Sequence, residues 1–169
     1  MRIESLNALP DDAARAGLAR CCGASRWVGA MLAARPYADR DALFAAAERA
    51  ADALGPDDWR QAFAHHPRIG DRAALERRFA STTAWAADEQ RGAATAAPGT
   101  LDALAEGNRA YEARFGYVFI VCATGLGARE MLSRLNARLC NDPERELAIA
   151  ADEQRKITRL RLAKLLEEE

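Results

Sequence analysis

Two adjacent histidines, His65 and His66, are the only histidines in the chain, and they stand where a helix is expected to stop. Pro67 disfavours the α conformation for the residue before it, so a helix that reaches this point should end near Ala64 and hold His66 in a fixed direction. Histidine titrates near neutral pH, and a helix C-terminus favours its charged form. His66 is therefore a candidate acid or base, although a histidine near a helix end is more often a cap or a surface residue.

A second candidate is the carboxylate of Glu89, which lies in the segment of residues 85–90. On a helix, Glu89 lies one turn beyond Trp85 and Ala86, so its carboxylate would share a face with an indole ring and a methyl group. The carboxylate is then either partly desolvated, which would suit proton transfer, or part of an exposed polar surface. The residues alone favour the exposed surface.

A third candidate, Arg161, lies in the last expected helix. Placed at 100° per residue, the apolar stripe of that helix consists of Leu147, Ala150, Ile157, Leu160 and Leu165. Arg161 falls inside the stripe, and Glu146, Glu153 and Lys164 fall near its edge. A guanidinium on an apolar face needs an anion, which could be a structural carboxylate, a partner chain or a substrate carboxylate. An arginine that extends its head group to water is the alternative.

Residue types and turn signals predict the elements that must position these side chains. Ala, Leu, Arg and Glu dominate, and Gly or Pro recur at helix-length intervals. This pattern indicates an all-α, single-domain helical bundle of about eight helices over residues 1–169. Ser25 and Asp39 are the expected N-caps of two of these helices. The expected helices cover approximately residues 10–22, 25–33, 39–54, 56–64, 83–91, 98–115 and 143–166, with one more starting after Gly127.

One segment departs from the helical pattern. Residues 117–123 are a short run of β-prone apolar residues, which is typical of a buried extended strand. No partner strand is apparent, and buried backbone N–H and C=O groups are normally hydrogen-bonded. The partner of this segment is either a small polar ligand with amide edges or, equally well, side chains, water or a further short strand.

Charge and cysteine usage exclude several classes of function. The net charge of -1 offers no basic surface for nucleic acid, and the balance of 50% hydrophobic and 29% charged residues is that of a soluble globular protein. No segment resembles a secretory leader or a membrane span, so a cytoplasmic protein is expected. No metal-ligand spacing is present. Reduced thiols, without a disulfide or zinc pattern, are expected for Cys21, Cys22, Cys122 and Cys140.

Taken in order, these motifs make the chain similar to the 2-oxo-4-hydroxy-4-carboxy-5-ureidoimidazoline (OHCU) decarboxylase family, which completes urate breakdown to (S)-allantoin. The resemblance covers nearly the full length. It is carried by Leu6-Asn7, Cys21-Cys22-Gly23-Ala24-Ser25-Arg26-Trp27, Arg35-Pro36-Tyr37, Asp58-Trp59, His66-Pro67-Arg68-Ile69-Gly70-Asp71, Trp85-Ala86-Ala87-Asp88-Glu89-Gln90, residues 115–123 and residues 156–162.

The resemblance implies an all-α enzyme without a cofactor or metal that acts on a small molecule and is usually a homodimer. It implies catalytic roles for His66, Glu89 and Arg161. The implied substrate contacts are Pro67, Ala86, Gln90, Phe119, Ile120, Val121, Cys122 and Ala123. Many members have Ser where this chain has Ala86, so one hydroxyl contact is missing here.

The reaction that the resemblance implies suits these residue types. Loss of CO2 from a carbon that bears a hydroxyl and a carboxylate sends electrons into the adjacent C=N bond, so no cofactor is needed as an electron sink. His66 would exchange protons with the hydroxyl or the developing enol, while Glu89 and Arg161 would orient the substrate.

Two other functions are compatible with the residues. A non-catalytic helical binding or assembly module would have no turnover that depends on His66. A hydrolase would use Cys122 as nucleophile and His66 as base, although a thiol in an apolar run tends to stay protonated. Thiol alkylation separates the hydrolase from the decarboxylase.

Overall fold

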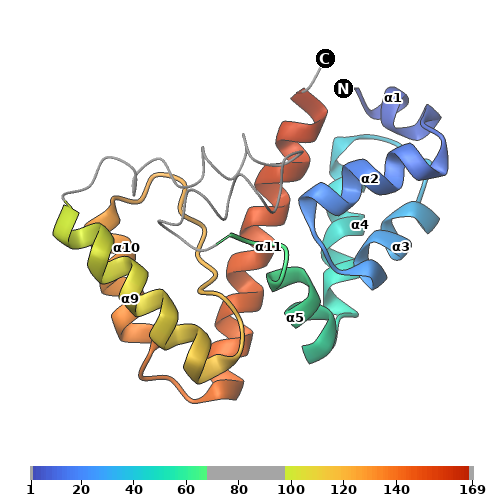
Figure 1. Ribbon diagram of the computed structural model, residues 1–169. Helices are drawn as coiled ribbons and strands as arrows, with labels where there is room; N and C mark the ends of the chain where they lie inside the picture. The colour runs from blue at the N-terminus through green and yellow to red at the C-terminus, as the bar shows by residue number, and fades with distance from the viewer. Residues whose placement is uncertain (1, 68–97, 168–169) are drawn as a thin grey trace. The chain divides into compact units, whose positions relative to one another are not determined.

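The computed structural model of the chain describes residues 2–67 and 98–167. These residues form eight helices and no strand, which confirms the all-α class. The helices, labelled in Figure 1, are α1 (Ile3–Ala8), α2 (Asp11–Cys21), α3 (Ser25–Ala33), α4 (Arg40–Asp52), α5 (Pro56–Phe63), α9 (Pro98–Phe115), α10 (Ala128–Arg138) and α11 (Pro143–Glu167). The helix predicted over residues 83–91 lies outside the described residues.

Local turn and cap chemistry accounts for several helix boundaries. The Oδ1 atom of Asp39 accepts a hydrogen bond from the Ala42 N–H at 2.7 Å, so Asp39 caps α4 as predicted. Pro56 opens α5, where its fixed φ suits the first helical position. Gly116 has φ +82° and ends α9, because a residue with a Cβ would be strained in this left-handed conformation.

Two predictions at the N-terminal helices were wrong. The six-residue helix α1 precedes the first helix that the sequence predicted. Ser25 does not cap α3, because its side chain and backbone both bind Gln61 instead. The Ser25 hydroxyl accepts a hydrogen bond from Nε2 of Gln61 at 2.8 Å, and the Ser25 N–H donates to Oε1 at 2.9 Å. The partner lies 36 residues away, so no local pattern could reveal it.

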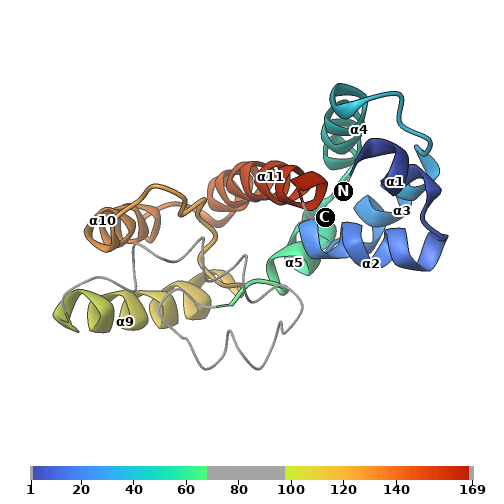
Figure 2. The ribbon, with the colours of Figure 1, turned by 90° about the horizontal axis from the view of Figure 1, so that it is seen from above.

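The chain divides into two compact units, which are described separately here as unit 1 (residues 1–62 and 154–169) and unit 2 (residues 63–153). In unit 1, α3 packs against both α2 and α4 and lies between them in Figure 2. The C-terminal part of α11 also belongs to this unit, where Leu165 lies 3.6 Å from the point that a Cβ on Gly17 would occupy. The fully buried side chains of unit 1 include Leu6, Leu18, Trp27, Met31, Leu43 and Leu162.

Unit 1 also contains a hydrogen-bonded corner that connects α1 with the loop before α4. The Asn7 side chain binds both the N–H and the C=O of Tyr37, at 2.9 and 2.8 Å. The Tyr37 hydroxyl donates to the Met31 carbonyl at 2.5 Å, and burial raises the pKa of Tyr37 to about 12. Two sequence blocks of the resemblance, residues 6–7 and 35–37, therefore have a structural role.

In unit 2, α9 and α10 lie side by side (Figure 1). Their close approach depends on Gly107, since a Cβ there would lie only 2.6 Å from Cδ2 of Leu135. Between these two helices in the chain runs the apolar segment of residues 117–123. The largest fully buried side chains of this unit are Tyr111, Leu104, Ile120, Met131, Leu135 and Phe63.

Candidate functional site

The segment of residues 117–123 lies within the described residues, and the resemblance assigns its backbone at 119–123 to substrate binding. All of its residues are buried except Cys122, which is partly exposed. This confirms the prediction of one buried non-helical segment. Within the described residues the segment pairs with no strand, so the interpretation as a β-strand was wrong. Its backbone is bound by side chains instead.

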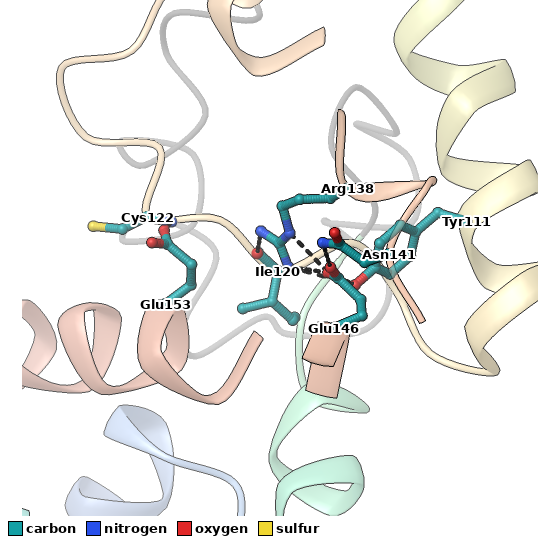
Figure 3. Close-up of polar contacts among 7 residues, drawn as sticks. All are labelled: Tyr111, Ile120, Cys122, Arg138, Asn141, Glu146 and Glu153. Carbon is teal, nitrogen blue, oxygen red and sulfur yellow. Dashed lines mark hydrogen bonds and ion pairs between the residues drawn. The ribbon is translucent and has the colours of Figure 1, made fainter. Parts of the chain in front are cut away.

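Two charged side chains bind this backbone (Figure 3). Arg138, the last residue of α10, donates from Nη1 to the carbonyl oxygen of Ile120 at 2.5 Å. Glu153 of α11 accepts the N–H of Cys122 through Oε2 at 2.6 Å. Of the alternatives that the sequence left open for the partner of this segment, side chains are therefore confirmed for these two groups.

A buried carboxylate neutralises Arg138. In Figure 3 the guanidinium lies between the Ile120 carbonyl and the carboxylate of Glu146, which is 0% exposed. Nε of Arg138 donates to Oε1 of Glu146 at 2.7 Å, and Nη2 lies 2.5 Å from the same oxygen. Asn141 donates to Oε2 at 2.8 Å, and the Tyr111 hydroxyl donates to Oε1. Each carboxylate oxygen thus has a donor, as a buried charge requires.

The protonation of Tyr111 follows from this arrangement. Burial holds the pKa of Tyr111 well above its usual 10.0, and its hydrogen bond to the Glu146 carboxylate acts in the same direction. The phenol therefore remains a hydrogen-bond donor at any physiological pH. Helical periodicity places Glu146 and Glu153 at the edge of the apolar stripe, two helical turns apart, and this spacing is the sequence signal for both residues. Arg138 and Tyr111 were not predicted from the sequence.

Val121 lies between the two bound backbone groups, and it is 6% exposed. Within the described part of the chain, neither its N–H nor its C=O makes a hydrogen bond. Buried backbone groups are normally paired, so Val121 retains one donor and one acceptor for a further partner.

The candidate base His66 is buried, with 7% of its surface exposed, whereas His65 is exposed. The helix before it ends at Phe63, and the His66 N–H donates to the Phe63 carbonyl at 3.0 Å. This bond closes a turn directly before Pro67, which is also buried. The expectation that a histidine here is more often a surface residue fits His65 and not His66.

Arg161 is 4% exposed, so it lies on the buried face of α11 as the helical periodicity predicted. Its Nη1 donates to the carbonyl oxygen of Arg20 at 3.4 Å. Burial raises the pKa of the nearby Cys22 thiol to about 11, and the positive charge of Arg161 opposes part of that rise. Arg161 and Cys22 belong to unit 1, whereas His66 and residues 117–123 belong to unit 2.

Glu89, Ala86 and Gln90 lie outside the described residues. The structure therefore describes two of the three predicted catalytic residues, each within its own unit.

Among the described residues, no group of three His, Cys, Asp or Glu side chains could hold a metal ion. No helix of the described ranges is long and apolar enough to cross a membrane.

Unit 1 contains a small hollow that is partly open to solvent. The described members of the predicted site do not line it. Arg155, one of its lining residues, lies 5.6 Å from the ring centre of Trp59 and pairs with Glu48 at 3.2 Å. The hollow is lined by Cys22, Trp27, Phe44, Ala47, Glu48, Ala51, Trp59, Arg155, Thr158 and Arg159.

Two relatives carry names that refer to uric acid degradation and to OHCU decarboxylation. The chain is 37% identical over 147 residues to the uric acid degradation bifunctional protein TTL of Arabidopsis thaliana, which covers 86% of this chain and 45% of that protein. It is 40% identical over 60 residues to the 2-oxo-4-hydroxy-4-carboxy-5-ureidoimidazoline decarboxylase of Amia calva, covering 36% of this chain and 34% of that protein. The chain thus spans less than half the length of these relatives.

Solved structures agree with the fold. The crystal structure of OHCU decarboxylase in the presence of (S)-allantoin matches with a TM-score of 0.75 at 34% identity, over 95% of this chain and 100% of that chain. The crystal structure of (S)-allantoin synthase matches with a TM-score of 0.70 at 17% identity, over 98% of this chain and 54% of that chain, which is a likeness of fold alone. The family model for OHCU decarboxylase matches residues 7–163, and the chain therefore belongs to the OHCU decarboxylase family.

Proposed function

We propose that this protein catalyses the decarboxylation of OHCU to (S)-allantoin and CO2 in urate breakdown. The observation that carries the proposal is the family match over residues 7–163. A similar structure, which this chain covers completely at 34% identity, was determined in the presence of (S)-allantoin. The burial of His66 supports the proposal, because its polar side chain is withdrawn from bulk water as a binding pocket requires.

The substrate supplies its own electron sink, so the protein has to supply protons and orientation. His66 exchanges a proton with the substrate hydroxyl or the developing enol, a role that contributes about 10²–10⁴ in rate. Glu89 orients the hydroxyl or the ureido group. Arg161 orients a ring carbonyl or the carboxylate, but it must not bind the carboxylate too tightly, since this would stabilise the ground state. The reaction needs neither a cofactor nor a metal.

Pro67, Ala86, Gln90 and the backbone of residues 119–123 complete the proposed substrate contacts. Within the described ranges the N–H and C=O of Val121 make no hydrogen bond, which supports this assignment, because the ring and ureido group of the substrate carry matching acceptors and donors. We further propose that residues 1–169 act as one domain in a cytoplasmic homodimer. Sedimentation velocity of the purified protein tests the dimer.

The decisive experiment adds the purified protein to freshly generated urate-oxidation intermediate and follows optical activity. Uncatalysed decay gives racemic allantoin, so the proposed enzyme should produce a rapid excess of the (S) enantiomer. A non-catalytic binding module would leave the product racemic.

Replacement of His66 by Asn should leave the fold intact and abolish stereospecific turnover, because the amide cannot exchange protons near neutral pH. Circular dichroism checks the fold, and His65→Asn is the matched control because His65 is exposed. Formation of (S)-allantoin at the normal rate by the His66 variant would remove His66 from the mechanism.

Arg161→Lys keeps the charge and loses the planar fork of the guanidinium. We expect KM to rise or kcat to fall, about tenfold in kcat/KM, because a lysine cannot make the bidentate contact. Steady-state kinetics measure the change. Kinetic constants equal to those of the wild type would show that Arg161 serves only the packing of unit 1.

The hydrolase alternative is disfavoured at Cys122. Both chain neighbours of Cys122 are buried apolar residues, Val121 and Ala123, and a thiol in such a segment tends to stay protonated. Modification of the Cys122 thiol should spare decarboxylation unless the added group fills the pocket. Methyl methanethiosulfonate keeps the added group small, because it converts the thiol to a methyl disulfide and releases methanesulfinate.

A further inference from the structure

The two side chains that bind the segment of residues 117–123 act on peptide planes that Val121 shares. The Cys122 N–H that Glu153 accepts lies in the same plane as the C=O of Val121. The Ile120 C=O that Arg138 binds lies in the same plane as the N–H of Val121. In a trans peptide unit the C=O and N–H bonds point in opposite directions.

Glu153 and Arg138 each bind one polar group of a rigid peptide plane. Each thereby fixes the direction of the other polar group of that plane. With the Cys122 N–H directed at Glu153, the Val121 carbonyl points away from Glu153. With the Ile120 carbonyl directed at Arg138, the Val121 N–H points away from Arg138. Neither of these two Val121 groups makes a hydrogen bond within the described residues. They form a donor and acceptor pair, and the contacts of Glu153 and Arg138 with the two peptide planes determine the direction in which this pair points.

We propose that Glu153 is a positioning residue, which orients the Val121 carbonyl to accept an N–H of the ureide substrate. Arg138 has the same effect on the Val121 N–H. This inference rests on the proposed function only for the identity of the ligand. A ureide presents N–H and C=O groups along one edge, which is the complement of the pair that Val121 offers.

Burial makes Glu153 suited to this task. The residue is 7% exposed, so its contact with the Cys122 N–H is partly shielded from water. A charge-assisted hydrogen bond of 2.6 Å is also stronger than a neutral one. The peptide plane between Val121 and Cys122 therefore loses much of its freedom to rotate before the ligand arrives, which lowers the ordering cost of binding.

Three substitutions test the proposal. Glu153→Ala removes the acceptor and should raise KM for OHCU by about tenfold, because the loss of a hydrogen bond to a charged group changes binding by about that factor. The variant should also lower the enantiomeric excess of the product. Glu153→Gln keeps a carbonyl oxygen at the same reach and should stay within about threefold of the wild type. Asp152→Ala is the matched control, since Asp152 is the exposed neighbour on the same helix and should leave KM unchanged.

A structural role alone predicts a different result. It would lower the thermal midpoint of Glu153→Ala and leave KM of the folded enzyme unchanged. Kinetics are therefore measured at a temperature where circular dichroism shows the variant folded. If the Ala variant does not fold, Glu153→Asp replaces it, because the shorter side chain withdraws the acceptor and keeps the charge. An unchanged KM in the folded variant, or equal damage from Gln and Ala, would overturn the proposal.

Binding of (S)-allantoin separates this inference from the proposed function. We expect the Val121 and Cys122 amide resonances of the wild type to shift on titration, with a Kd about tenfold weaker for Glu153→Ala and restored by Gln. Wild-type protein that binds allantoin but does not decarboxylate OHCU would refute the function and leave the positioning role standing. Absence of a shift at Val121 in the wild type, or wild-type affinity in Glu153→Ala, would refute the positioning role.

Discussion

Arg138 in unit 2 and Arg155 in unit 1 both contact acidic side chains, yet their surroundings are opposite. Arg138 and Glu146 are buried, and each has further hydrogen-bond partners. Arg155 pairs with Glu48 and Asp52 at 3.2 and 2.9 Å, but those two acidic side chains are 49% and 70% exposed. Water and salt screen the exposed charges around Arg155, whereas they do not reach the buried charges of Arg138 and Glu146. A buried ion pair can therefore hold an irregular backbone segment in place, whereas an exposed pair contributes little to the structure.

The strongest test of this comparison is Glu146→Ala. It leaves the Arg138 guanidinium buried without its carboxylate, which should cost about 3–5 kcal/mol of unfolding free energy. Urea denaturation measures the loss, and Glu144→Ala, an exposed change in the first turn of the same helix, is the control. A loss below about 1 kcal/mol would mean that the buried pair behaves like a surface pair.

A second test uses the buried thiol of unit 1. Burial raises the pKa of Cys22 from its usual 9.0 to about 11, so the native state holds this proton when the unfolded state releases it. The protonated Cys22 thiol makes its full contribution to the free energy of unfolding below pH 9. This contribution is lost as the pH rises towards 11, which lowers the free energy of unfolding by roughly 2–3 kcal/mol. The free energy of unfolding should fall more steeply over this range for the wild type than for Cys22→Ala. Parallel pH profiles would contradict the shift.

The smallest effect is expected from Arg155→Ala. Exposed ion pairs contribute about 0–1 kcal/mol to stability. The free energy of unfolding of this variant should therefore lie within about 1 kcal/mol of the wild-type value. The residual difference should shrink in 1 M NaCl, because salt screens exposed charges. A larger, salt-independent loss would show that stacking over Trp59, at 5.6 Å, contributes more than the ion pairs.

What the sequence predicted well depends on short-range chemistry. The cap at Asp39 and the helix start at Pro56 involve neighbours within four residues, and both are confirmed. The burial of Arg161 followed from helical periodicity within one element. The family followed from motifs spread along the chain, and the family match over residues 7–163 confirms it.

What the sequence did not predict depends on partners that only folding brings together. Tyr111 and Glu146 are 35 residues apart, and Ile120 and Arg138 are 18 apart. No periodicity in one helix indicates such a pairing. The strand interpretation of residues 117–123 was wrong for the same reason, since a β-prone run can be satisfied by side chains from two helices.

The contact between Gly107 and Leu135 bears on how this fold can vary among its homologues. A Cβ at position 107 would lie 2.6 Å from Cδ2 of Leu135, so the two positions share one small volume. In related sequences, Ala or Ser at the first position should be accompanied by a smaller residue at the second. Such paired substitution would record the spacing of these two helices as an evolutionary constraint.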